Sequence, residues 1–302
     1  MFWQKSLTTK KKERINNMAF SDLQLKVASE SAVMAAHANI AKLALFAHTF
    51  TELNGRPGES IAVPVYDLSA SGQFNPGTND YGTGANEVGG LLINLDQHLV
   101  KSIAITDKEL AYTGINWVKD SAYALADRIT RDVNKYAIGL FNDTNVSLSA
   151  TLDVTSKTAV ANLYKIAADN DIPVDRAIVI LGPTDFAKVL AMVDYNMIGS
   201  GDYIKTGVIE NLFGFKAFVC STFLQSGVKG VIALDSALGV ASKYLAPMTP
   251  DAYPEAWAAT DENGFAIGFR RFMNLNTGAD LFACDALFGC KLLQKDRCVL
   301  LK

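Results

Sequence analysis

The sequence predicts a mixed α+β fold in which one long helix supports several strands and a glycine-rich loop projects from the body. The helix is expected from about Trp117 to Leu140, where apolar residues recur at steps of three and four. Apolar and polar residues alternate over 61–65 and 101–106, as they do in strands. Between Asp67 and Gly90 glycines are frequent, and this segment is too long for an ordinary connection inside a compact domain. Its strand-like flanks favour a projecting hairpin.

The composition is that of a globular chain with enough apolar material for one large or two modest domains. Of its 302 residues, 49% are hydrophobic and 20% are charged, and the formal net charge is -3. This balance argues against a body that binds nucleic acid through broad electrostatic attraction, which needs clustered Lys and Arg. Only the N-terminus is basic. It is either a solvated, flexible arm or an arm that touches DNA or a neighbouring subunit through Lys10, Lys11, Lys12 and Arg14.

Neither export nor membrane insertion is expected. No apolar run follows the N-terminal basic residues, as a secretory signal would require. The most apolar long segment, Val228 to Leu245, is interrupted by charged residues and falls short of the ~20 apolar residues of a membrane helix. We therefore expect a soluble protein. Its cysteines lack the CxxC spacing of zinc sites, and we expect reduced, mostly buried thiols at Cys220, Cys284, Cys290 and Cys298.

The sequence contains no recognisable catalytic, cofactor-binding or metal-binding motif, and we expect no enzyme and no cofactor. The three histidines, His37, His48 and His98, are too dispersed for a metal motif. The fragment GTGANE at 82–87 begins like a dinucleotide fingerprint, but Glu87 occupies the third glycine position. No phosphate loop or nucleophile elbow occurs. A site assembled only in space stays open at this point.

The second half of the chain has its own alternation of helices and strands after a polar stretch at 142–157. A buried strand is expected at 177–181, and a helix is expected to begin near Pro183. The further elements expected are a helix around Val160 to Ile166, strands at 217–220, 231–234 and 264–269, a short helix near 279–286, and strands at 288–293 and 298–301.

Four weak motifs stand in a characteristic order. They are GESIAVP at 58–64, ITDKE at 105–109, ALADR at 124–128 and GVIENLFGFKAFV at 207–219. Through them the chain, from about Phe20 to Leu301, resembles the tailed-bacteriophage major capsid protein family, whose fold is the Hong Kong 97 type. In the resemblance these motifs correspond to the opening of the long hairpin called the E-loop, the approach to the spine helix, the spine helix itself and the axial domain. The segment 279–301 resembles the family's last helix and strands.

The resemblance implies a division of the chain into five segments. They are an N-terminal arm at 1–54, a strand and E-loop hairpin at 55–98, a peripheral domain with the spine helix at 99–156, an axial domain at 157–243, and a return to the peripheral domain with C-terminal strands at 244–302. Intersubunit contacts of the E-loop are expected at Phe74, Tyr81 and Val88. Some relatives crosslink subunits through an E-loop lysine, but this chain has no lysine between Lys42 and Lys101.

The function implied is a major capsid protein that self-assembles as pentamers and hexamers into the icosahedral head of a tailed phage around double-stranded DNA. Its expected partners are further copies, a portal, separate scaffolding or decoration proteins, and packaged DNA through weak contacts. The expected location is the virion, after assembly in the host bacterial cytoplasm. Two alternatives stay open: an encapsulin-like cellular nanocompartment shell, and a soluble two-domain α/β enzyme with the glycine-rich segment as a lid.

Overall fold

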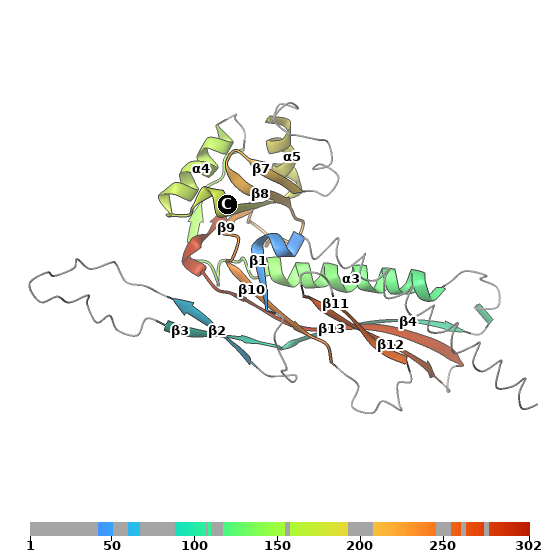
Figure 1. Ribbon diagram of the computed structural model, residues 1–302. Helices are drawn as coiled ribbons and strands as arrows, with labels where there is room; N and C mark the ends of the chain where they lie inside the picture. The colour runs from blue at the N-terminus through green and yellow to red at the C-terminus, as the bar shows by residue number, and fades with distance from the viewer. Residues whose placement is uncertain are drawn as a thin grey trace, which may run out of the picture.

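The computed structural model describes residues 42–50, 60–66, 88–106, 108–109, 117–154, 158–192, 208–245, 255–260, 264–274 and 278–302. Within these residues the chain forms two six-stranded sheets and one separate pair of strands. Figure 1 shows a long sheet lying under a long helix, with the second sheet and two shorter helices above one part of it. The main hydrophobic core runs through both sheets as one continuous cluster.

The long sheet is built around one strand of fourteen residues, β13 (Ala279–Leu292). Along one edge β13 pairs with β4; along the other it pairs with β12 and then with β10. All of these pairs are antiparallel, and β1 is added to β10 in parallel. The remaining strands of this sheet are β1 (Ala47–Phe50), β4 (Gln97–Thr106), β10 (Leu238–Lys243), β11 (Glu255–Thr260) and β12 (Ala266–Asn274).

Helix α3 (Trp117–Gly139) lies along one face of this sheet, which confirms the long helix predicted from the sequence. Its buried residues follow the helical steps of three and four, so a single stripe faces the strands. Tyr136 meets Phe288 of β13 edge to face, with ring centroids 5.6 Å apart. The stripe comprises Ala122, Leu125, Ala126, Ile129, Val133 and Ala137.

The second sheet has the order β5-β14-β9-β6-β8-β7. Every residue of β6 (Ala177–Leu181) and β9 (Gly230–Leu234) is buried, as expected for central strands covered on both faces. At Gly230 a Cβ atom would lie 2.7 Å from the carbonyl oxygen of Ile180, so only glycine fits there. The other elements are β5 (Leu148–Ala150), β7 (Val208–Leu212), β8 (Phe215–Cys220), β14 (Cys298–Leu301), α4 (Ala159–Asp169) and α5 (Pro183–Met192).

The short helix expected near 279–286 is wrong, because these residues form the first part of β13. Here Phe282, Cys284 and Phe288 point toward α3, while Asp285 and Leu287 lie on the opposite face, which is also covered. A strand buried on both faces gives a nearly continuous apolar run, and such a run does not distinguish strand from helix.

The strand pairing also differs from the predicted segment boundaries. Strand β10, expected within 157–243 as part of the axial domain, pairs with β13 in the long sheet. Strand β5, from the segment 99–156, and β14, from the segment 244–302, pair with each other, and β14 pairs with β9 in the second sheet. The chain therefore crosses between the sheets more often than a linear division allows, because partners far apart in sequence leave no local signal.

The turn between β9 and β10 is one of these crossings, and an ionic cluster holds it. Asp235 accepts hydrogen bonds from Arg176 Nη2 and Lys216 Nζ, each at 2.9 Å. Burial alone would raise the pKa of Asp235, but the hydrogen bonds and charges of Lys216 and Arg176 outweigh it and hold this pKa below its usual value. The two cations therefore favour the charged carboxylate that closes the turn.

Residues 42–46, which were expected to belong to an N-terminal arm, are helical and form part of the core of the subunit. Leu43 and Phe46 are both 1% exposed, and the Phe46 ring meets that of Phe141 edge to face, with centroids 6.2 Å apart. The part of the predicted arm that the structure describes is thus fixed between the sheets by its own apolar contacts.

Replacing Phe46 by alanine tests this placement. We expect Phe46→Ala to lower the free energy of unfolding of the unassembled subunit by about 3–5 kcal/mol, because the cavity left behind cannot close. Tyr123→Ala, at an exposed position of α3, is the matched control and should change it by about 0.5 kcal/mol or less. Urea denaturation measures both. Equal effects of the two substitutions would show that 42–46 is not part of the core.

Candidate assembly surface

The pair of strands that flanks the glycine-rich segment is the first candidate for contacts between subunits. β2 (Ser60–Tyr66) and β3 (Val88–Asn94) are antiparallel over their whole length, from Ser60 opposite Asn94 to Tyr66 opposite Val88. This confirms the strands predicted on either side of the segment. Figure 1 shows the pair extending beyond one end of the long sheet.

A small separate core attaches the base of this strand pair to the long sheet. We call it the hairpin anchor. Leu287 lies on the face of β13 opposite Phe288, so the anchor and α3 occupy opposite faces of the sheet. The buried residues of the anchor are Ile61, Val63, Ile93, Leu95, Ala241 and Leu287, with Phe50 and Leu293 packed against them.

Two glycines let the backbones approach closely at the anchor. A Cβ atom on Gly289 of β13 would collide with the carbonyl oxygen of Asn94. One on Gly239 of β10 would lie 2.8 Å from Ile93 Cδ1. Beside them, Lys291 Nζ donates a hydrogen bond of 2.9 Å to the carbonyl oxygen of Leu92. The position of the hairpin base is therefore set by backbone contact as well as by burial of apolar side chains.

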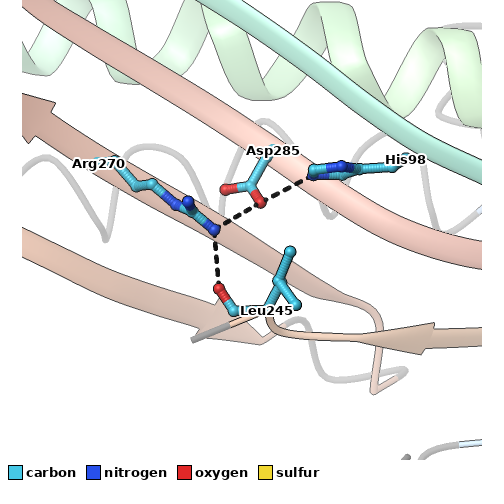
Figure 2. Close-up of polar contacts among 4 residues, drawn as sticks. All are labelled: His98, Leu245, Arg270 and Asp285. Carbon is cyan, nitrogen blue, oxygen red and sulfur yellow. Dashed lines mark hydrogen bonds and ion pairs between the residues drawn. The ribbon is translucent and has the colours of Figure 1, made fainter. Parts of the chain in front are cut away.

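A buried carboxylate ties three strands of the long sheet together on the same face as the anchor. Asp285 of β13 is 5% exposed, and its Oδ2 lies 3.2 Å from His98 Nε2 on β4 and 3.3 Å from Arg270 Nη2 on β12. The same Arg270 nitrogen donates to the carbonyl oxygen of Leu245 at 2.9 Å, as Figure 2 shows. A buried charge of this kind is tolerated because a countercharge and hydrogen bonds compensate it. Replacing Arg270 would therefore leave the Asp285 carboxylate buried without its countercharge and would destabilise the fold.

Asp285 also explains a glycine in the neighbouring strand. Gly268 lies opposite Asp285 in the β12–β13 pair, and a Cβ there would lie 2.6 Å from Asp285 Oδ1 and 3.0 Å from the Tyr244 ring. Burial raises the pKa of Tyr244, the charge of Arg270 lowers it, and that of Asp285 raises it further. The cluster is a packed structural centre that holds β4 and β12 to β13.

Most residues predicted to make contacts lie outside the described part of the chain. This applies to Phe74 and Tyr81 in the hairpin and, at the N-terminus, to Lys10, Lys11, Lys12 and Arg14. Val88 is described as the first residue of β3, opposite Tyr66. His48 is exposed and its ring stacks on Phe50, whereas His98 belongs to the Asp285 cluster.

All four cysteines lie in the described residues, and each is a free thiol, as predicted. Cys284 and Cys298 are buried, and the other two are partly buried. Burial raises the pKa of Cys298 to about 12 and also raises the pKa of Cys284 and Cys290. These thiols are therefore protonated near neutral pH and are poor nucleophiles.

The described residues contain no group of three His, Cys, Asp or Glu side chains placed to hold a metal ion. In the same ranges, no helix has the length and apolar character needed to cross a membrane.

Comparison with known proteins finds similarity in structure and not in sequence. No protein-family model and no curated protein matches the chain. Among solved structures, the capsid of a native GTA particle matches with a TM-score of 0.58 and 14% identity, over 88% of this chain and 89% of that one. The virus-like particle of Pyrococcus furiosus matches with a TM-score of 0.55 and 13% identity, over 90% of this chain and 98% of that one. The capsid of cyanophage P-SCSP1u matches with a TM-score of 0.53 and 15% identity, over 85% of this chain and 86% of that one.

The matches cover nearly the whole chain, so they concern its entire architecture. The chain has the fold found in these capsid and particle proteins. It is the Hong Kong 97-type capsid fold, which confirms the fold class predicted from the sequence.

The hairpin anchor yields a prediction at Gly289. In Gly289→Ala the added methyl group collides with Asn94, so we expect β2 and β3 to detach from the long sheet and the free energy of unfolding to fall by about 1–3 kcal/mol. Amide exchange in β2 and β3 should accelerate more than in β6. Gly90→Ala, which adds the same group to β3 with nothing within 4 Å, is the control. Unchanged exchange in Gly289→Ala would disprove the close contact.

Proposed function

We propose that this chain is the major capsid protein of a tailed bacteriophage, which assembles from pentamers and hexamers into an icosahedral head around double-stranded DNA. In this proposal the long sheet and α3 form the peripheral domain, the second sheet forms the axial domain, and β2, β3 and the segment between them form the E-loop. The chain acts as a building unit and performs no catalysis.

One observation carries the proposal: the fold is shared along almost the full chain with proteins that form shells. The GTA, cyanophage and Pyrococcus furiosus structures named above are described as capsids or as a virus-like particle. A fold alone does not determine function. Here, however, two features of the described residues also favour assembly: the strand pair β2–β3, which reaches beyond the long sheet, and strand β4, whose second edge no described strand covers.

The partners follow from this role. The chain would bind further copies of itself, a portal at one vertex, and separate scaffolding or decoration proteins where these exist. Its contact with DNA would be weak and would come from the basic residues Lys10, Lys11, Lys12 and Arg14, since the net charge of the whole chain is -3. The mature protein would reside in the virion after assembly in the bacterial cytoplasm.

A second candidate is a cellular nanocompartment shell of the encapsulin kind. The similarity to the virus-like particle of Pyrococcus furiosus, which is matched over 98% of its length, is equally consistent with such a shell. The two functions differ in their contents. A phage head would carry DNA and would stand beside portal and terminase genes, whereas a compartment would carry a protein cargo.

Electron microscopy of the purified protein tests the proposal directly. We expect closed shells or ring-shaped capsomers in negative stain, and particles recovered from the native source should protect DNA from nuclease. A protein that stays monomeric or forms only a small oligomer at every salt and protein concentration would refute the shell function. Shells with protein cargo and no DNA would favour the nanocompartment.

Shortening the hairpin tests the role of the E-loop. Replacing Gln73 to Glu87 with a short Gly-Ser turn should leave the melting temperature of the subunit near the wild-type value, because the hairpin anchor that holds its base is untouched. Shells or capsomers should no longer form, since an isolated two-stranded hairpin is marginal in water and must be ordered by a neighbour. Normal shells from this variant, or a variant that cannot fold, would overturn the assignment.

A further inference from the structure

Strand β4 has one edge that no described strand covers. It pairs with β13 from Gln97 to Thr106 on one side, and within the described residues no strand pairs with its other side. The N–H group of Thr106 donates to Glu109 Oε2 at 3.0 Å, so it points to the open side. Because peptide groups alternate in direction along an antiparallel strand, those of residues 98, 100, 102 and 104 also face outward.

The side chains of the same residues are exposed and mostly uncharged. Val100 is 59% exposed, and Ser102 and Ala104 beside it are exposed as well. Natural edge strands usually avoid pairing by being short, twisted or charged. This strand has ten residues and only one charged residue, Lys101. Its composition therefore favours pairing with another strand.

We propose that β4 pairs antiparallel with β4 of a second copy of this chain across a two-fold axis, so that two long sheets become one. The inference rests on the proposed shell function, since an icosahedral shell requires two-fold contacts. A two-fold interface brings the same patch of both subunits together. An exposed edge strand meets this condition when it pairs with itself.

The faces of the sheet restrict the register of this pairing. Side chains that lie directly opposite each other in two paired strands point to the same face of the sheet, and side chains alternate between faces along each strand. The two-fold axis must therefore pass through one residue, which pairs with its own copy, and not between two residues. An axis at Lys101 would bring two like charges together. An axis at Ser102 avoids this and places Val100 opposite Ala104 on both sides. In each of these pairs the outward peptide groups of the two strands face one another.

The end of β4 at Thr106 limits the length of the intermolecular pairing. Beyond Ala104 the next outward N–H is that of Thr106, and Glu109 already accepts it. The two hydrogen bonds from Thr106 also lower the pKa of Glu109, which keeps this acceptor ionised. The intermolecular ladder is therefore limited to residues 100–104 of each copy.

A partly apolar groove beside β4 completes the fit. It lies between α3 and the strand and has a volume of about 450 Å³. Its lining combines the apolar Leu99, Tyr136, Leu140 and Phe288 with the charged Asp132 and Lys135. In the register centred on Ser102, Ile105 of the second copy lies opposite Leu99. The second copy would therefore place an apolar side chain at the mouth of this groove and exclude water from it.

A cysteine at the two-fold axis tests the proposal. Directly paired residues have Cα atoms about 5.5 Å apart, within the range that a disulfide spans. In Ser102→Cys shells treated with a mild oxidant, we expect most of the protein to run as a dimer on a non-reducing gel. Addition of reductant should return it to monomer. Ala104→Cys is the control, because the two copies of residue 104 would be four residues out of register. The double variant Val100→Cys/Ala104→Cys should crosslink again.

A second variant tests the pairing without an oxidant. Proline at 102 removes only an outward N–H, so Ser102→Pro should keep the melting temperature of the subunit near wild type while the yield of shells falls at least tenfold. If Ser102→Cys forms shells as the wild type does but gives no disulfide-linked dimer, the pairing is overturned and the shell function still stands. If the wild type forms no shells, the same gel on concentrated Ser102→Cys protein decides: a dimer supports the pairing, and a monomer overturns it.

Discussion

The structure depends on strand β13, because the parts packed on both of its edges and on both of its faces take their positions from it. One edge carries β4 and the other carries β12 and β10 in succession. One face packs against α3 through Phe288, and the other holds the Asp285 cluster and the hairpin anchor. A shift of one residue in the register of β13 would exchange these faces. Phe288 would then leave α3, and Asp285 would enter the apolar core.

The local elements could be predicted where an element shows the helical period, or where a buried apolar run is as short as a typical strand. Helix α3 was predictable because its apolar stripe has the helical period, and β6 because a short apolar run stands between turn signals. Strand β13 was not, since burial of both faces removes the alternation that identifies a strand, and its run of 14 residues is long enough for a helix. The membership of β5, β10 and β14 in their sheets was also not predictable, because pairing between distant segments leaves no periodic signal.

The candidate assembly surface was predicted in outline and missed in detail. Alternation at 61–65 was enough to predict β2, and the glycine-rich segment indicated a hairpin. The anchor was missed because Gly239 and Gly289 have no distinctive neighbours in the sequence, and their role appears only when the backbones meet. His98 and Asp285 are 187 positions apart, so their hydrogen bond has no counterpart in sequence spacing. The open edge of β4 is likewise a property of the sheet and not of the strand's own residues.

The position of the two last strands bears on when the protein can fold during its synthesis. β13 is the centre of one sheet, and β14, which ends at Leu301, lies inside the other between β5 and β9. Neither sheet can close while these residues are still within the ribosome, even though α3 and β6 have long emerged. A growing chain therefore cannot present a finished subunit surface to its neighbours. Each copy becomes competent for assembly only once β13 and β14 have left the ribosome.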